Sequence, residues 1–506
     1  MLTKETKKDI EVRKLNSSEW QKIAIDTARQ GYRFAAIWAQ DLDENFELNI
    51  VLELQASYLL LQTLIDVGNP SIASFTPYFP AANRLERHTK DMFGIDFIGH
   101  PDRRRWTRHQ AWSREQFPLR KSFSVAKIPG KVTPPDSAYS FLPVLGSGTC
   151  EIPVGPVHAG IIEPGHFRFQ IAGEDVIDLE EHLGYTHKGV EKIAEGRTVN
   201  QLIKLAGRVS GDSTVSYAWA ACAALENAAY LTVPERALHL RALMSERERV
   251  ANHLGDFAAI CNDVAYSFPY YQLMRLKELW LRLNGTIFNH RLMMDCIIPG
   301  GVKYDLGAWH IQELQKQVTD FRSELNELLF IFEAHSGLHD RIKATGVLTE
   351  KQAKVFGVLG YVGRASGAKL DLRRDLAYPP YDKLEVRVPV YEHGDVLARL
   401  RVRFQEILVA FDLIEQLLNT MPTGEIYNSW VSPNIITEGI GLIEGWRGEI
   451  ITFVRLGSDG LVERYFPRDP SWFSWPALEQ LIHGNIVPDF PVCNKSINGS
   501  YSGVDL

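Results

Sequence analysis

Long runs of apolar residues with helical spacing constrain the fold of this chain more than any other feature. Between residues 183 and 418 apolar positions recur three and four apart, which is the spacing of one face of an α-helix. The runs cover residues 183–195, 198–231, 234–264, 272–284, 306–335 and 395–418. Pro234 opens its run at the helix position that best accepts proline. The sequence therefore predicts a large body built mainly of helices.

The opening third of the chain has a different pattern. Residues 32–38 and 47–54 predict two strands joined by a polar turn, and a helix is predicted to begin at Pro80. Farther on, hairpins are predicted at residues 167–179 and 439–455, and a strand at 461–465. The expected fold class is α+β, with a small N-terminal α/β domain and a large, mainly helical domain that carries short sheets at its margins.

A proline-rich segment separates the two predicted domains. Residues 127–148 contain four prolines and little periodicity, which is typical of a linker. We therefore expect a domain at residues 1–125, a linker at 126–149 and a second domain at 150–506. With 506 residues, of which 45% are hydrophobic, the chain can bury two cores.

Charge and cysteine content exclude several function classes. A net charge of -7 is mild for this length and the basic residues are scattered, so no nucleic-acid partner is expected. The five cysteines are odd in number and far apart, which is not the pattern of a disulfide framework. The polar start MLTKETKKDIEVRKL and the lack of a long apolar stretch predict a soluble, cytoplasmic chain that can still dock on a membrane complex.

Several long motifs resemble known families. ERHTKDMFGIDFIGHPDRRR and PLRK, within residues 80–121, resemble the small peripheral-arm partner of the quinone-site subunit of respiratory complex I (NADH:quinone oxidoreductase). GPVHAGIIEPGHFRF, GEDVIDLEEHLGYTHKGVEKIAEG, ERERVANHL and DLRR…PPYDKLEVRVPVYEHGD resemble that quinone-site subunit itself, and more closely the large subunits of energy-converting nickel-iron hydrogenases. The formate hydrogenlyase (hydrogenase-4) type large subunit is similar in having both parts fused. The resemblance covers nearly the whole chain.

This resemblance reveals a departure at the metal site. Where a hydrogenase large subunit carries two Cys-x-x-Cys pairs, this chain has Ser210 with Ser213 and Cys493 with Ser496. A hydroxyl is hard and weakly acidic, so it cannot replace the soft thiolates that nickel and low-spin iron need. Gly211 stands where a quinone reductase of this family has its pocket tyrosine. The sequence therefore predicts that the chain binds no metal.

The resemblance also implies a pair of proton-transfer residues. The histidine matching His187 borders the quinone headgroup in complex I, and the glutamate matching Glu191 is the first proton acceptor beside the hydrogenase metal. Four residues apart, the two would share one face of a helix. Imidazole titrates near neutrality, and burial can raise a glutamate into the same range. The alternative is a helix start in which Glu191 pairs with Lys188 or Lys192 on a solvated face.

Two more charged residues are catalytic candidates through the resemblance. The carboxylate matching Asp263 couples to a quinone-site histidine in complex I, and Arg373 in the family's arginine-bearing loop could polarise a bound oxygen. Structural ion pairs are the alternative for both. Cys493 is either a leftover small apolar residue or a single thiolate with a new ligand. The candidates for the cofactor side of the pocket are His158, His182, Ser210, Ser213 and Cys493.

Together these observations predict a subunit of a membrane-associated, hydrogenase-related, complex I-like oxidoreductase. It would couple electron transfer to ion translocation without a functional nickel-iron centre, and the chain itself would bind no cofactor. A quinone-like molecule is one option for the electron acceptor. Expected partners are a small subunit with iron-sulfur clusters, a ferredoxin-like subunit and antiporter-like membrane subunits, on the cytoplasmic side of the cytoplasmic membrane. The alternatives are a non-redox structural or coupling scaffold and, less favoured, an active nickel-iron hydrogenase.

Overall fold

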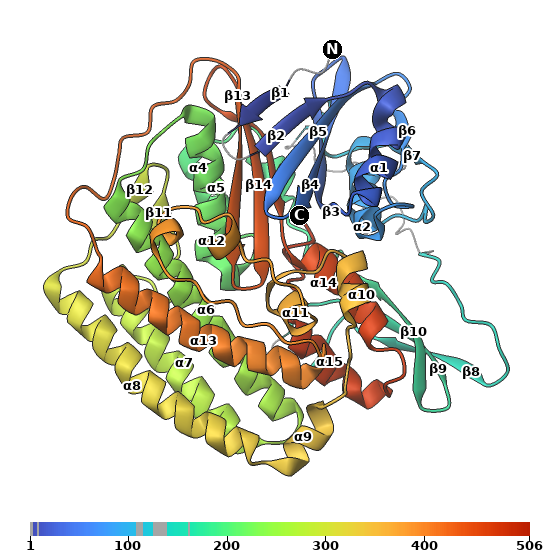
Figure 1. The fold of residues 1–506 in the computed structure, drawn as a ribbon. Helices are drawn as coiled ribbons and strands as arrows, with labels where there is room; N and C mark the ends of the chain where they lie inside the picture. The colour runs from blue at the N-terminus through green and yellow to red at the C-terminus, as the bar shows by residue number, and fades with distance from the viewer. Residues whose placement is uncertain (1–3, 8–9, 108–114, 125–138, 160–161) are drawn as a thin grey trace.

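Sheets and long helices form separate layers of the molecule. The computed structural model describes residues 4–7, 10–107, 115–124, 139–159 and 162–506. An N-terminal sheet and a C-terminal sheet lie beside each other above a bundle of long helices (Figure 1). The predicted α+β class is confirmed. Within these described ranges, no helix is both long and apolar enough to cross a bilayer.

A five-stranded sheet forms the core of the N-terminal part. Its strands are β1 (Lys4–Lys7), β2 (Ile10–Lys14), β3 (Arg33–Asp41), β4 (Asn45–Leu54) and β5 (Ser57–Asp66), in the order β1-β2-β5-β4-β3. All neighbours are antiparallel except β2 and β5, which are parallel. Helices α1 (Trp20–Arg29) and α2 (Asn83–Phe93) and the small pair β6 (Ser71–Ala73) and β7 (Asp96–Ile98) complete this part. The strands predicted at 32–38 and 47–54 are confirmed.

A second antiparallel sheet begins the large domain. It contains β8 (Thr149–Val154), β9 (His166–Ala172) and β10 (Asp175–His182), and the hairpin predicted around Gly173 is confirmed. The predicted linker falls largely on residues 126–138, which lie outside the described residues, so the domain boundaries stay a prediction.

Four long helices form the body of the large domain. These are α6 (Glu235–Asp263), α7 (Ser267–Phe288), α8 (Ala308–Glu333) and α13 (Val396–Asn419). Three of them lie within two residues of their predicted ranges, whereas α7 extends beyond its predicted range of 272–284 at both ends. Shorter elements connect them: β11 (Ile297–Ile298), β12 (Gly301–Val302), α9 (Ser336–Ile342), α10 (Glu350–Val355), α11 (Gly360–Ala365) and α12 (Leu372–Asp375). Helix α6 is buried along most of its length even though it carries many charges, so these charges must find partners inside the protein.

Two predicted helices are wrong in extent. The helix predicted at 183–195 is only α3 (Val190–Ala194), because Gly184 and Gly189 adopt left-handed backbone angles before it. His187 therefore precedes the helix and does not share a helical face with Glu191. The helix predicted at 198–231 is two helices, α4 (Val199–Ala206) and α5 (Thr214–Ala229), separated by a break that contains Ser210 and Ser213.

The C-terminal sheet places a tight turn in the centre of the large domain. It consists of β13 (Thr437–Gly445), β14 (Gly448–Leu456) and β15 (Val462–Arg468), followed by α14 (Ser471–Leu481) and α15 (Phe490–Ile497). The predicted hairpin and the strand after it are confirmed. Helix α5 crosses β13 so closely that a Cβ on Gly439 would lie 1.9 Å from the Ala224 carbonyl oxygen. This close approach brings the β13–β14 turn to the break between α4 and α5.

The N-terminal and C-terminal sheets share one buried interface. Trp38 of β3 packs on Phe453 and Phe466, with ring centroids 4.9 and 5.6 Å apart. The Arg33 guanidinium donates to Glu449 of β14 at 2.7 Å and to Glu53 at 2.9 Å. The N-terminal part and the large domain, which we call the two modules, therefore both contribute apolar and charged groups to a single core.

Candidate functional site

A cavity of about 320 Å³ lies where the α4–α5 break, helix α6, the β13–β14 turn and the C-terminal segment meet. Its lining residues are Ile162, Glu163, Ser210, Gly211, Asp212, Asp256, Ala259, Arg447, Asn494, Lys495, Asn498, Gly499, Tyr501 and Ser502. Ten of these fourteen residues have polar or charged side chains, but the larger part of the lining surface is apolar. The cavity is therefore suited to a ligand that has both polar and apolar parts.

A bidentate ion pair forms one wall of the cavity. Arg447 Nη1 and Nη2 donate to the two carboxylate oxygens of Asp212 at 2.8 and 2.7 Å. Burial acts to raise the pKa of Asp212, but the charge and hydrogen bonds of Arg447 outweigh it, so this pKa is lowered. The guanidinium also stacks on the Trp446 ring at 3.9 Å. Asp212 is thus a fixed carboxylate with its charge neutralised by a cation.

The hydroxyl groups in the α4–α5 break are already hydrogen-bonded. Ser210 Oγ donates to Asp212 at 2.7 Å and lies 2.9 Å from Ser500 Oγ. Ser213 Oγ accepts from Trp446 Nε1 at 3.0 Å and from Arg447 Nη1 at 3.2 Å. Of these two serines, only Ser210 lines the cavity.

The Ser496 hydroxyl, in the second pair of positions that correspond to metal-binding cysteines, is also hydrogen-bonded. Arg399 Nε donates to Ser496 Oγ at 2.8 Å, and that hydroxyl donates to the Cys493 carbonyl at 2.7 Å. Cys493 is fully buried, and burial raises the pKa of its thiol to about 12. A thiol with that pKa stays protonated at neutral pH. This placement favours the interpretation of Cys493 as a small buried residue.

Glu191 joins the two modules in the protein interior. Its side chain is 2% exposed, and one carboxylate oxygen lies 2.7 Å from His88 Nε2 on α2. Arg464 of β15 forms an ion pair with the other oxygen. Burial acts to raise the pKa of Glu191, but Arg464 and His88 outweigh it and lower the pKa to about 2. Glu191 is therefore an ionised, buried carboxylate.

The alternative of a surface pair for Glu191 is wrong. Lys188 Nζ donates to the carbonyls of Arg208 and Val209, and Lys192 Nζ pairs with Glu195 at 2.6 Å. Because Glu191 is enclosed between α2 and β15, neither lysine is needed to compensate its charge.

Asp263 contacts a residue of the cavity wall. It ends α6 and accepts from Lys495 Nζ at 2.8 Å, and Lys495 lines the cavity. Its second oxygen is buried without a hydrogen-bond partner among the described residues. Asp263 therefore influences the charge at the cavity through Lys495.

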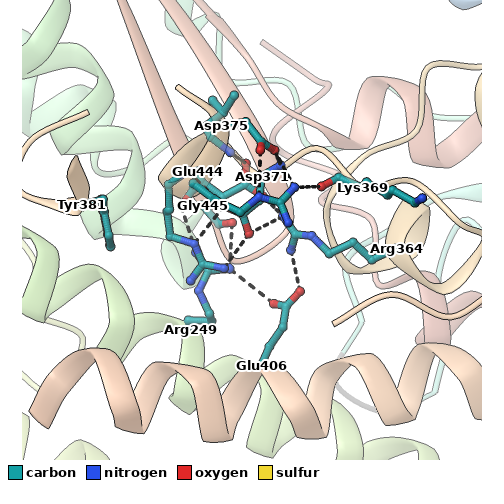
Figure 2. A network of polar contacts seen from close by, with 12 residues as sticks. Arg249, Arg364, Lys369, Asp371, Asp375, Tyr381, Glu406, Glu444 and Gly445 are labelled. Atoms are coloured by element: carbon teal, nitrogen blue, oxygen red, sulfur yellow. Dashed lines mark hydrogen bonds and ion pairs between the residues drawn. The ribbon is translucent and has the colours of Figure 1, made fainter. Parts of the chain in front are cut away.

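Arg373 is fully buried in a cluster of charged side chains. Figure 2 shows other members of this cluster, among them Arg364, Asp371 and Glu406. It donates from Nε and Nη2 to Asp371 at 3.0 and 2.7 Å, and from Nη1 to Glu246 at 3.0 Å. All three guanidinium nitrogens are engaged and the side chain is fully buried. This placement favours the structural ion pair over a contact with a bound oxygen.

The three histidine candidates have separate surroundings. His158 Nε2 donates to the Gly165 carbonyl at 2.7 Å. His182 stacks on Tyr139 with centroids 4.2 Å apart, and burial together with Arg87 lowers its pKa to about 4. His187 is half-buried between β10 and α3. None of these three is among the residues that line the cavity.

Comparison with known proteins places this arrangement in a family. Residues 11–129 match the family described as respiratory-chain NADH dehydrogenase, 30 Kd subunit, residues 263–438 the corresponding 49 Kd subunit, and residues 188–261 nickel-dependent hydrogenase. The carbon monoxide-induced hydrogenase of Rhodospirillum rubrum is 32% identical over 354 residues, which is 69% of this chain and 97% of that protein. Formate hydrogenlyase subunit 5 of Escherichia coli (strain K12) is 29% identical over 486 residues, which is 94% of this chain and 85% of that protein.

The chain belongs to the nickel-iron hydrogenase large-subunit and complex I 49 kDa subunit family. The resemblance inferred from its motifs is confirmed. A solved structure of the membrane-bound sulfane sulfur reductase, an archaeal respiratory membrane complex, is similar with a TM-score of 0.65 and 26% identity, and covers 71% of this chain and 99% of that chain. The relatives are subunits of membrane-bound hydrogenases and complex I-like complexes, which implies membrane and subunit partners.

The residues at the hydrogenase metal position do not fit a nickel-iron centre. Three of the four thiolate positions are hydroxyls, and Arg447 and Arg399 donate into two of them, Ser213 and Ser496. A guanidinium that occupies a ligand oxygen both blocks its lone pair and repels a metal cation. Across the described part of the chain, no three His, Cys, Asp or Glu side chains gather in a way that could hold a metal ion.

Several cavity residues had no signal in the sequence. Arg447 was visible only as part of a predicted turn, and its partner Asp212 lies 235 positions away. Lys495 and Asp256 likewise enter the cavity from distant segments. Residues this far apart can be paired only by the fold.

Proposed function

We propose that this chain is the large subunit of a complex I-like membrane oxidoreductase whose cavity works without a nickel-iron centre. The observation that carries the proposal is the donation of Arg447 and Arg399 into Ser213 and Ser496, the hydroxyls that replace metal-binding thiolates. Electrons would reach the cavity from iron-sulfur clusters in a small partner subunit, with a ferredoxin-like subunit delivering them. Antiporter-like membrane subunits would use the energy, with this chain on the cytoplasmic side.

The cavity would hold the final electron acceptor, and a quinone-like molecule is the first candidate. Support comes from the polar side chains of its lining and from the Lys495–Asp263 pair at its wall, which offers a charged hydrogen-bond donor. Gly211 leaves open space at the cavity wall, because a Cβ there would meet nothing within 4 Å. His187 would serve proton movement in the same reaction, whereas Glu191, whose pKa is lowered to about 2, would act as a fixed charge.

The test uses the purified membrane complex. We expect iron from partner clusters, only trace nickel, and no hydrogen uptake; stoichiometric nickel with hydrogen uptake would overturn the proposal. The cavity is tested with Gly211→Trp, which fills it, and Gly211→Ala as the matched small change. Cluster reoxidation by added acceptors, followed by electron paramagnetic resonance, should stop in the tryptophan variant and persist in the alanine variant. Unchanged reoxidation in both would favour the scaffold function instead.

A further inference from the structure

The cluster that contains Arg373 has an unbalanced charge. Seven side chains joined by ion pairs, which Figure 2 shows in part, form what we name the charge cluster: Glu246, Arg249, Arg364, Asp371, Arg373, Glu406 and Glu444. Each is at most 1% exposed. Four carboxylates face three guanidinium groups, so full ionisation would leave one net negative charge in the protein interior. Such a charge is costly to bury, and a bound proton removes it.

The four carboxylates differ in how many hydrogen bonds and ion pairs they receive. Asp371 accepts from Arg373 twice and pairs with Arg364 at 2.8 Å. Glu246 accepts from Arg373, Arg249 and the Tyr381 hydroxyl.

Glu406 receives more ion pairs and hydrogen bonds than Glu444. Glu406 is bound by Arg364 at 2.5 Å, by His253 at 2.8 Å and by Arg249 at 3.5 Å. Glu444 has one ion pair, with an Arg364 nitrogen that also serves Asp371, and a long bond of 3.2 Å from the Leu372 amide. It is therefore the carboxylate with the weakest compensation.

We propose that the charge cluster is a proton-binding site, with Glu444 as the group that takes up and releases the proton. Burial, followed by the charge of Asp371, raises the pKa of Glu444 to about 7, in agreement with this assignment. Arg364 and its neighbours lower the pKa of Glu406 instead, and Arg373 and Arg249 lower that of Glu246. One proton is gained or lost, and no bond other than O–H changes.

Three titratable groups beside the cluster each keep one protonation state near neutral pH. Burial lowers the pKa of His253, which leaves its imidazole neutral at neutral pH, and raises the pKa of both Tyr378 and Tyr381. Charged and titratable groups also adjoin the cluster from neighbouring elements. They are His253 on α6, Arg374 and Asp375 on α12, Tyr378 and Tyr381 after α12, and Arg403 on α13. Arg403 pairs with Asp256 at 3.3 Å.

One short turn connects the proton site to the cavity. Glu444 is the last but one residue of β13, the Gly445 carbonyl accepts from Arg249 at 3.1 Å, and Arg447 pairs with Asp212 in the cavity wall. Gly360, at the start of the helix that carries Arg364, packs so tightly on this turn that a Cβ would lie 1.9 Å from the Arg447 carbonyl. A change of charge in the cavity should therefore alter the proton affinity of Glu444.

The proton can be observed directly in the purified complex by infrared difference spectroscopy across a pH titration. Burial also raises the pKa of Glu86 and Glu248 to about 7, so the signal of Glu444 is the difference between the wild-type and Glu444→Gln titrations. We expect this difference to contain a protonated-carboxyl carbonyl band that disappears as the pH rises, and the control Glu425→Gln, on an exposed loop, to retain the wild-type intensity. Identical titrations in wild type and Glu444→Gln would overturn the assignment. If the variant does not assemble, wild-type protein with carbon-13 glutamate should show a shifted band and carbon-13 aspartate should not.

The link to the cavity has its own measurement. Arg447→Met removes a positive charge from the cavity wall and should move the midpoint of the band to higher pH. The control Arg282→Met removes an exposed helix cation and should leave the midpoint in place. Equal midpoints in wild type and Arg447→Met would refute the coupling while leaving the proton site itself intact.

Discussion

Replacement of Glu191 by glutamine should weaken the junction between the two modules by several kcal/mol. The pKa of Glu191 falls from its ordinary 4.5 to about 2 in the folded protein, and this difference corresponds to about 3 kcal/mol at neutral pH. Loss of one partner from a buried ion pair costs about 3–5 kcal/mol, because it leaves Arg464 uncompensated. The pKa difference and the cost of a broken ion pair agree in size, so we expect the free energy of unfolding to fall by about 3–5 kcal/mol.

The pH dependence distinguishes this effect from a simple packing defect. Because the folded pKa is lowered, the stabilisation is complete above pH 4.5 and is lost as the pH falls toward about 2. Urea unfolding at a series of pH values should therefore show wild type approaching Glu191→Gln in that acid window. The control Glu174→Gln, on an exposed hairpin turn, should follow wild type throughout. An equal gap between wild type and Glu191→Gln at neutral and acid pH would refute the argument.

A double-mutant cycle can then assign the interaction to its partner. His88→Asn removes the imidazole that lies 2.7 Å from Glu191, and the double variant should lose less stability than the sum of the two single variants. Additive losses would mean that His88 and Glu191 act independently despite their contact.

Further predictions concern packing and thiol chemistry. Gly439→Ala should destabilise the protein by at least about 1–3 kcal/mol in urea unfolding, because the Ala224 backbone cannot move aside, whereas Gly211→Ala should have no effect. Cys150 should react with maleimide in the native protein while Cys493 should not, because only Cys150 is exposed. Rapid labelling of Cys493 would contradict its buried, protonated state.

The long helices were predictable because their apolar spacing repeats over many helical turns. The segments at 234–264 and 395–418 became α6 and α13 almost residue for residue. Strand β5 was missed because its turn from β4 uses Gln55 and Ala56, neither of which is a turn-forming residue, although both adopt left-handed angles. Local patterns fail where tertiary packing imposes the backbone.

The candidate site was predictable only in part. The motif resemblance identified Ser210 and Ser213, because both residues lie within one short motif that can be recognised along the sequence. The pairing of Glu191 with His88 could not be foreseen, because the partners are 103 positions apart and belong to different modules. The charge cluster was equally hidden, since a sequence shows how many arginines and glutamates a helix has but not which ones meet.

The buried interface between the N-terminal and C-terminal sheets has a consequence for assembly. Because Trp38 and Phe453 belong to one polypeptide, the two sheets meet within one molecule, and their contact does not depend on the protein concentration. Two separate subunits would need tight intermolecular affinity to bury ion pairs such as Arg33–Glu449. Within a single chain, a contact too weak to survive dilution still closes, and the two modules are always produced in equal amounts.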